Sequence, residues 1–325
     1  MKAIVLKKYG SPSDLALEEH PTPTPKPDEV LVKIVATAVN DWDWCLTRAK
    51  PFYIRLLCGF FSPKVRIPGA EISGVVEKRG SEVTTLAEGD AVYADISECG
   101  FGGFAEYVCV PASTVSKKPE SISHFQAAAL PHAAMLAIQG LFDSGELQPG
   151  QSLLANGAGG GVGTLAVQLA KAHGVDDVTG VDSADKAASM KEQGYNKTID
   201  YQAEDFTRNG GQYHLILDTK TNRFPLSYLR ALHPGGRYVT VGGRTRHLLL
   251  TFLVAPLIHL FTKKRIRIVG IQTNRDLDQV SELCASGKLT PLVEGPFPLK
   301  EAPRLVQRFG EGRHQGKIIL TTQTP

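Results

Sequence analysis

The stretch ANGAGGGVG, residues 155–163, decides how the rest of this chain is interpreted. It follows the short apolar run SLLA (152–155) and leads into VGTLAVQLAKAHG (162–174), whose apolar residues have helical spacing. A strand, a tight glycine turn and a helix in this order are typical of the first unit of a parallel sheet. The sequence therefore predicts an α/β fold with a doubly wound parallel sheet around this turn.

The glycines of the turn indicate a site for phosphate groups. In the form A-x-G-x-x-G, starting at Ala158, Gly160 lets the backbone approach a pyrophosphate, and Gly163 lets the helix pack closely on its strand. The helix N-terminus then offers unpaired N–H groups to the phosphates. A glycine run also suits a tight turn without a ligand, but the strand and helix beside it favour a dinucleotide site. Its predicted residues are Gly157, Ala158, Gly160, Gly161, Val162 and Gly163.

An acidic residue ends the next predicted strand, DVTGVD (177–182). In dinucleotide sites a carboxylate at this place accepts hydrogen bonds from the adenosine ribose, and it repels a 2′-phosphate. Asp182 therefore slightly favours NADH over NADPH, although Lys186, four positions on, is able to receive a phosphate. The alternative is that Asp182 only caps the following helix.

Outward from the turn the chain has two patterns. Residues 1–120 contain short β-branched runs separated by glycine and proline, which indicates a barrel-like β domain. Residues 121–272 alternate strand and helix, as βαβ units do, and Pro131 divides the alanine-rich stretch 123–142 into two helices. Residues 273–325 are too few for a domain, so we expect them to complete the first one.

Bulk composition limits the classes of function. The 325 residues are 42% hydrophobic and 21% charged, which is typical of soluble globular proteins. A net charge of +3, without a long basic block, gives no reason to expect a nucleic acid partner. Five cysteines without a C-x-x-C pair favour a reducing compartment, and the N-terminus lacks a signal peptide, so we expect a cytoplasmic protein.

The longest apolar run, LLLTFLVAPLIHLF (248–261), is too short to cross a bilayer, and Pro256 interrupts it. A buried or dimer-facing helix is the first interpretation. Peripheral contact with a membrane is the alternative, since Lys263, Lys264 and Arg265 follow directly.

The whole chain resembles the medium-chain dehydrogenase/reductase superfamily, and within it the zinc-independent quinone-oxidoreductase-like branch. The motifs that carry the resemblance are VNDWDW (39–44), IPGAEISGVVEKRG (67–80), FAEYVCVP (104–111), AAALPHAAMLA (127–137), GAGGGVG (157–163), TIDYQAEDF (198–206) and GRHQGKIIL (312–320). The resemblance implies a GroES-like catalytic domain from 1–120 plus 273–325, a Rossmann domain from 121–272, and a homodimer joined through edge strands such as 265–272.

Members with a catalytic zinc carry a cysteine where this chain has Asn40 and a His-Glu pair where it has Ala70-Glu71. A third ligand lies near the position of His132. Since a catalytic zinc usually has three protein ligands, the resemblance implies no zinc here. His132 and Glu71 are then expected to pack or hydrogen-bond internally.

Without a metal, quinones or α,β-unsaturated carbonyls are the expected acceptors, because the transferred electrons delocalise onto an oxygen already conjugated to the attacked carbon. The resemblance places Asn40, Tyr53 and Asp43 near the nicotinamide as candidate catalytic residues. The alternatives are a turn role for Asn40, packing for Tyr53 and a capping role for Asp43.

The resemblance also implies cofactor contacts for Tyr201, Gly242, Gly243 and Lys317. It leaves the NADPH preference of many relatives in doubt, because those relatives have a neutral residue in place of Asp182. The sequence thus predicts an NAD(P)H-dependent reductase of quinones or enones. Two alternatives stay open: a zinc alcohol dehydrogenase with unusual ligands, and a non-enzymatic, membrane-associated scaffold that binds the cofactor.

Overall fold

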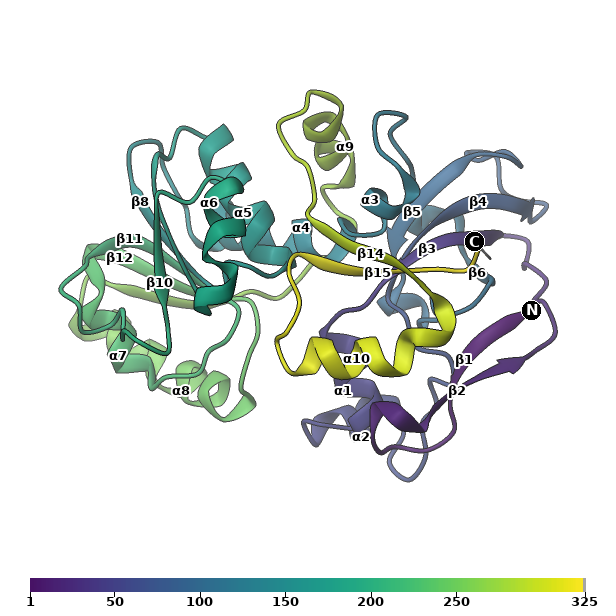
Figure 1. Ribbon diagram of the computed structural model, residues 1–325, viewed down its shortest axis with the longest axis horizontal. Helices are drawn as coiled ribbons and strands as arrows, with labels where there is room; N and C mark the ends of the chain where they lie inside the picture. The colour runs from purple at the N-terminus through teal and green to yellow at the C-terminus, as the bar shows by residue number, and fades with distance from the viewer. Residues whose placement is uncertain (324–325) are drawn as a thin grey trace. The chain divides into compact units, whose positions relative to one another are not determined.

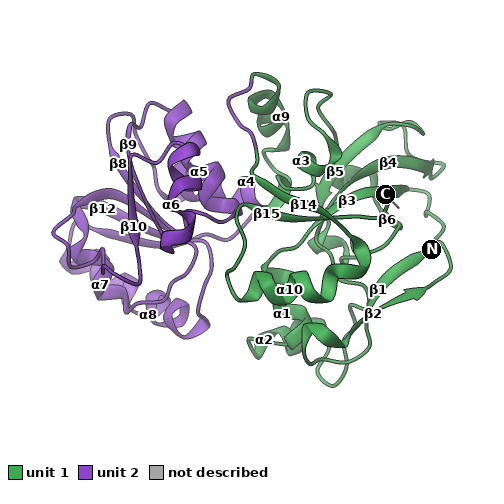
Figure 2. Cartoon of the chain, viewed as in Figure 1, with its two compact units in different colours: residues 1–132, 273–286, 291–325 green, residues 133–272, 287–290 purple. Residues whose placement is uncertain are grey.

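The computed structural model describes residues 1–323. The chain forms two compact units, shown in green and purple in Figure 2. Unit 1 comprises residues 1–132, 273–286 and 291–325, and unit 2 comprises residues 133–272 and 287–290.

Unit 1 therefore extends past residue 120, where the sequence placed the boundary. The added segment contains α3 (His124–Ala127), which packs on β3 and β4 of the first unit. The ring Nδ1 of His124 lies 2.8 Å from the Ser73 hydroxyl of β4. These contacts explain why the segment belongs to unit 1.

Unit 1 is built mainly from antiparallel strands (Figure 1). They are β1 (Lys2–Leu6), β2 (Leu15–Glu19), β3 (Glu29–Ala38), β4 (Glu71–Arg79), β5 (Ala91–Asp95), β6 (Tyr107–Pro111), β7 (Ser116–Lys117), β14 (Val293–Pro298) and β15 (Lys317–Thr321). β1 and β2 form a hairpin, and the other seven form one sheet in the order β14-β15-β3-β4-β5-β7, with β6 also paired to β3. β3 is long and rich in valine and isoleucine, so it pairs with three partners and organises the unit.

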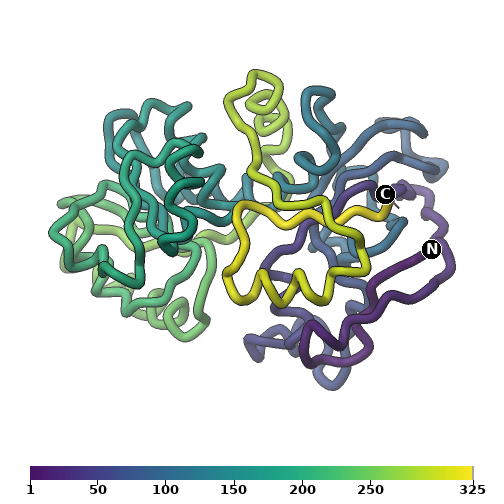
Figure 3. The backbone as a smooth tube through the Cα atoms, viewed as in Figure 1, coloured from purple at the N-terminus to yellow at the C-terminus, as the bar shows by residue number. Residues whose placement is uncertain are grey.

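The C-terminal segment lies within unit 1. β15 runs antiparallel to β3, with Ile319 opposite Ala38, and β14 is parallel to β15. In Figure 3 the yellow end of the chain accordingly runs beside the purple beginning. The first and last parts of the sequence thus share one sheet.

Five α-helices belong to unit 1: α1 (Asp41–Arg48), α2 (Tyr53–Cys58), α3, α9 (Leu277–Ala285) and α10 (Ala302–Gly310). α1 starts with a capping box, in which Asn40 and Asp43 satisfy each other's backbone N–H groups. α10 is strongly amphipathic and packs on α1. The apolar core lies beneath these helices and inside the sheet, where Ile4, Leu6 and Leu305 are fully buried.

Unit 2 contains the predicted doubly wound sheet. Its strands are β8 (Ser152–Asn156), β9 (Asp177–Asp182), β10 (Lys197–Asp200), β11 (Tyr213–Asp218), β12 (Leu232–Thr240) and β13 (Arg265–Ile268). All pairings are parallel, and the order is β10-β9-β8-β11-β12-β13. The order reverses between β8 and β11, which defines a topological switch point at the carboxyl ends of these two strands. The predicted fold class is confirmed.

The helices that follow are α4 (Pro131–Ile138), α5 (Gly161–Ala172), α6 (Ala187–Glu192), α7 (Pro225–Arg230) and α8 (Thr245–Phe261). Pro131 begins α4, so the predicted break in the alanine-rich stretch is confirmed. α7 ends at Arg230, and β12 begins at Leu232. Within residues 1–323, no helix combines the length and the apolar character needed to cross a bilayer.

Candidate functional site

The glycine turn lies directly after β8, at the switch point of the sheet. The backbone N–H groups of Gly157 and Ala158 donate to the Val181 carbonyl, at 2.9 and 3.1 Å, which ties the turn to the end of β9. Gly160 caps α5, and a helix leaves the N–H groups of its first turn without intrahelical partners. These groups, at residues 161–163, offer the partial positive charge that a phosphate requires.

Two glycines of this turn are there for steric reasons. Gly157 has φ +92°, and a Cβ there would lie 2.1 Å from the Thr219 hydroxyl. At Gly163 a Cβ would lie 2.5 Å from the Ala158 carbonyl oxygen, so only glycine lets α5 approach the turn this closely. The backbone geometry is thus that of a cradle with no room for side chains.

Asp182 is the last residue of β9 and lies buried beside the turn. Its carboxylate accepts hydrogen bonds from backbone N–H groups of neighbouring residues. Its Oδ2 accepts from the Gly159 N–H at 3.0 Å, and its Oδ1 accepts from the Ser183 N–H at 3.0 Å. The Lys186 ammonium forms an ion pair with Oδ1 at 3.2 Å. The structure therefore places Asp182 and Lys186 together at the glycine turn, with the lysine neutralising the carboxylate.

Further predicted residues follow the carboxyl ends of the neighbouring strands. Tyr201 comes after β10, is exposed, and donates its backbone N–H to the Asp182 carbonyl at 3.2 Å. Gly242 and Gly243 come after β12, and a Cβ on Gly243 would lie 2.2 Å from the Lys220 carbonyl. The predicted cofactor residues of unit 2 thus all lie at the carboxyl ends of its parallel strands.

A second turn at these strand ends escaped the sequence analysis. Asp218, fully buried at the end of β11, accepts from the N–H groups of Lys220 and Thr221 at 2.8 and 3.0 Å, and from the Asn156 amide at 2.8 Å. The Tyr238 hydroxyl donates to its other oxygen at 2.9 Å. The signal was present as LILDT at the end of an apolar strand, the same pattern that identified Asp182.

Unit 1 holds a separate cluster of buried charges. Glu71, fully buried at the start of β4, accepts from the Asn40 side-chain amide at 3.2 Å and from the His132 backbone N–H at 2.9 Å. The Lys317 ammonium, also buried, forms an ion pair with the same carboxylate. The structure thus places Lys317, predicted as a cofactor residue, on Glu71 in unit 1.

The His132 imidazole lies between two carboxylates. Its Nδ1 is 2.7 Å from Oδ2 of the buried Asp95, and its Nε2 is 3.5 Å from Oδ1 of the exposed Asp41. Burial acts to lower the pKa of His132, but the hydrogen bonds and charges of Asp41 and Asp95 outweigh it and raise the pKa to about 10. His132 is therefore a cation at neutral pH.

The three candidate catalytic residues differ in burial and in their hydrogen-bond partners. Asn40 and Asp43 are buried together, and the Asp43 carboxylate accepts from the backbone N–H groups of Asn40 and Gly69, at 2.9 and 2.8 Å. Burial raises the pKa of Asp43 to about 7. Asp43 serves as the capping residue that the sequence left as an alternative.

Tyr53 lies on the surface at the start of α2, with about half of its side chain exposed. Burial of the hydroxyl, followed by the charges of Cys45 and Asp41, raises its pKa. Tyr53 thus lies within the influence of Asp41, the residue that follows Asn40.

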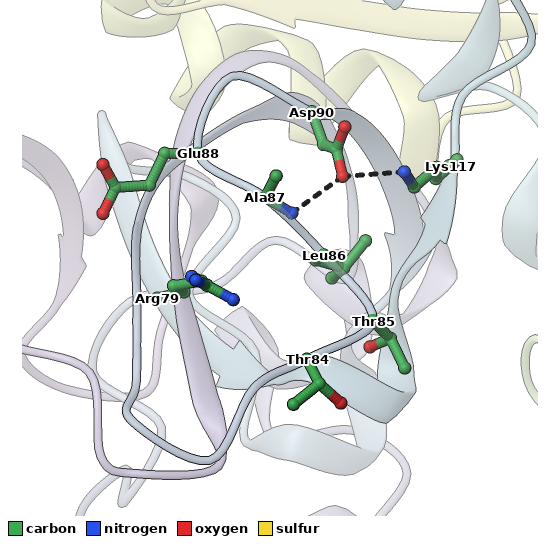
Figure 4. Close-up of a pocket in the computed structure, with 8 residues that line it drawn as sticks. All are labelled: Arg79, Thr84, Thr85, Leu86, Ala87, Glu88, Asp90 and Lys117. Carbon is green, nitrogen blue, oxygen red and sulfur yellow. Dashed lines mark hydrogen bonds and ion pairs between the residues drawn. The ribbon is translucent and has the colours of Figure 1, made fainter.

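In the part of the chain that the structure describes, no group of three or more His, Cys, Asp or Glu side chains is arranged to hold a metal. A hollow on unit 1, shown in Figure 4, is lined by Arg79, Thr84, Thr85, Leu86, Ala87, Glu88, Asp90 and Lys117. Asp90 accepts from the Ala87 N–H and pairs with Lys117. None of the predicted site residues lines this hollow.

Comparison with known proteins identifies the family. Residues 26–120 match the alcohol dehydrogenase GroES-like domain, and residues 193–320 match the zinc-binding dehydrogenase family. The chain is 32% identical to 2-methylene-furan-3-one reductase of Solanum lycopersicum, over 98% of this chain and 79% of that protein. The chain belongs to the medium-chain dehydrogenase/reductase superfamily.

Two further relatives place this medium-chain reductase in the quinone-oxidoreductase-like branch. It is 31% identical to the NADPH-dependent alkenal/one oxidoreductase, chloroplastic, of Arabidopsis thaliana, over 98% of this chain and 79% of the relative. The quinone oxidoreductase of Coxiella burnetii has the same fold, with a TM-score of 0.87, 28% identity and 99% coverage of each chain. The resemblance expected from the sequence motifs is confirmed.

Proposed function

We propose that this medium-chain reductase transfers hydride from NAD(P)H to a quinone or an α,β-unsaturated carbonyl. The observation that carries the proposal is the glycine cradle at the switch point of a parallel sheet, beside an acidic strand end. The names of the relatives, an alkenal/one oxidoreductase and a quinone oxidoreductase, support the acceptor class.

The residues of unit 2 suit a nicotinamide dinucleotide. The amides of residues 161–163 bind the pyrophosphate in this proposal, and Gly157, Ala158 and Gly160 form the turn that leads to them. Asp182, Lys186 and Tyr201 hold the adenosine end, while Gly242 and Gly243 lie toward the nicotinamide. When bound, the cofactor supplies the hydride, and the chain has to orient it and exclude water.

NADH is slightly favoured over NADPH in this proposal, since a carboxylate at the ribose position repels a 2′-phosphate. Two features weaken that preference. Asp182 already receives the Gly159 and Ser183 N–H groups, and Lys186 neutralises it. The Lys220 side chain also lies close to Gly157, since a Cβ added to Gly157 would be 3.0 Å from the Lys220 Cε. Lys220 thereby adds a second positive charge beside the turn.

Reduction without zinc is part of the proposal, and the contacts of unit 1 support it. The Glu71 carboxylate already receives an amide, a backbone N–H and an ammonium. Both ring nitrogens of His132 face carboxylates. These residues do not suit a zinc ion, because their donor atoms are engaged with one another and Asn40 replaces a thiolate.

Asn40 and Tyr53 are the proposed hydrogen-bond donors to the acceptor oxygen. An asparagine amide has two N–H donors, and Asn40 directs one of them to Glu71. The Tyr53 side chain is about half exposed, and its hydroxyl is the proposed source of a proton for an enolate or quinol oxygen. Asp43 and Lys317 position these donors. Asp43 caps α1, and Lys317 compensates the charge of Glu71.

A homodimer and a reducing compartment such as the cytoplasm complete the proposal. β13 is the last strand of its sheet, and its outer edge is where we propose that a second copy pairs. All five cysteines are free thiols, which is consistent with a reducing environment, although one relative is named chloroplastic.

The deciding experiment measures binding of NADH and NADPH to the purified chain, then their oxidation with a panel of quinones, enones and simple ketones. We expect micromolar binding of at least one nucleotide and turnover with quinones or enones, unaffected by chelators. Turnover of alcohols that is lost on chelation would indicate a zinc dehydrogenase instead. Nucleotide binding without turnover of any acceptor would indicate a scaffold.

A further inference from the structure

The helix α8 turns a large apolar face outward. Six of its side chains are between 57% and 78% exposed: Leu249, Phe252, Leu253, Leu257, Leu260 and Phe261. Their spacing of three and four residues places them on one stripe. The opposite side holds the buried Thr251 and Ile258, and the helix packs on α7 and β13. A contiguous exposed stripe of this kind marks an interaction surface.

The charged residues within and directly beside α8 in the sequence all have one sign. Between Arg244 and Arg275 the sequence has seven Lys or Arg residues and neither Asp nor Glu. Arg244 and Arg246 lie at the start of α8, and Lys263, Lys264 and Arg265 follow its end. The stripe is thus apolar in its middle and basic at both ends.

We propose that this face of α8 binds the surface of a membrane that contains anionic lipids. A helix of 17 residues is about 25 Å long, and with its apolar side chains on one face it suits a position in the plane of the interface. Basic residues at the ends then meet the lipid headgroups. This proposal is independent of the redox function, since it uses none of the cofactor residues.

Charge decides between a membrane and a second copy of the chain. A twofold contact through this face would bring two sets of basic residues together, and the segment has no carboxylate to meet them. An anionic surface pairs with the same residues favourably. Arg267 takes no part in this argument, because Glu146 already neutralises it.

A second segment, in unit 1, has the same character. Phe52, Leu56, Leu57, Phe60 and Phe61 are all exposed, on α2 and the residues beside it. Residues 44–70 contain five Lys or Arg and no Asp or Glu. An exposed apolar cluster within a basic, acid-free stretch of sequence is therefore found in unit 1 as well as in unit 2.

The test is sedimentation of the full chain with vesicles of phosphatidylcholine, alone or mixed with phosphatidylserine. We expect at least about tenfold more bound protein on the mixed vesicles, and release at high salt. Equal binding to both vesicles, or no binding to either, would overturn the proposal.

A triple variant, Phe252→Ser with Leu257→Ser and Phe261→Ser, should lose most of the vesicle binding while it still binds the nucleotide. The matched control is Leu17→Ser with Phe224→Ser, which removes exposed apolar side chains elsewhere and should bind vesicles as the original chain does. If instead the triple variant turns a dimer into a monomer without lipid, and the original chain ignores vesicles, the face is a contact between copies and the proposal fails.

Discussion

The glycine cradle of unit 2 and the charged cluster of unit 1 are built in opposite ways. The cradle consists of backbone groups from one short segment, residues 157–163, at the start of α5. The cluster consists of side chains from distant parts of the chain, and its donors and acceptors point to one another. Backbone sites of the first kind bind, while clusters of the second kind stabilise and position.

The difference has an energetic basis. In the cradle, the N–H groups of the first turn of α5 have no intrahelical partners and therefore suit an anion. In the cluster, the Glu71 and Lys317 charges are removed from water, so each requires its partner. Substitutions should therefore affect binding in unit 2 and stability in unit 1.

The largest effect is expected from Gly163→Ala. The added Cβ would lie 2.5 and 2.6 Å from the Ala158 carbonyl oxygen and Cα, so α5 has to move away from the turn. We expect nucleotide affinity to fall by about 100-fold, or by about 3 kcal/mol. Isothermal titration with NADH and NADPH measures it. Gly270→Ala, where a Cβ would meet nothing within 4 Å, is the control and should bind normally.

Lys317→Met should lower the free energy of unfolding by about 3 kcal/mol, because it leaves the Glu71 carboxylate buried without its cation. The double variant with Glu71→Gln should recover most of this loss in chemical denaturation. It also separates two roles for the lysine. If the double variant is stable but binds NAD(P)H weakly, Lys317 contacts the cofactor as well as Glu71.

His132 should make stability depend on pH. Its pKa of about 10 in the folded chain lies above the usual value near 6.5, so its contribution is complete below about pH 6.5. That contribution is lost as pH rises through 10. His132→Gln should flatten the stability profile between these values by about 2 kcal/mol or more. The exposed His233, changed to Gln, serves as the control, and an unchanged slope in His132→Gln would contradict the assignment.

The smallest effect is expected from Asp182→Ser. Without the carboxylate, affinity for NADPH should rise relative to NADH by about tenfold, or about 1.4 kcal/mol. Asp176→Ser makes the same change of charge at the other end of β9 and should leave the ratio unaltered. A constant ratio in Asp182→Ser as well would show that the Lys186 pair already hides the carboxylate from the cofactor.

The sequence predicted the parallel sheet and its glycine turn because both depend on local patterns. Strand, turn and helix alternate within short segments, and the glycines of a tight turn can be recognised in the sequence without knowledge of the tertiary structure. The same pattern, an acidic residue at the end of an apolar strand, identified Asp182 but was overlooked at Asp218. The compact units divide after residue 132 rather than after residue 120, because α3 packs on β3 and β4, which lie far away in the chain.

Local sequence patterns could not predict the cluster of buried charges in unit 1. Asn40, Glu71 and His132 were flagged only through the resemblance, and nothing local indicated that Lys317 meets Glu71 from 246 residues away. Sequence alone determined the fold class, the glycine turn after β8 and the family. Tertiary structure alone decided which charges are paired, because burial and pairing arise only when β3, β4 and β15 come together in one sheet.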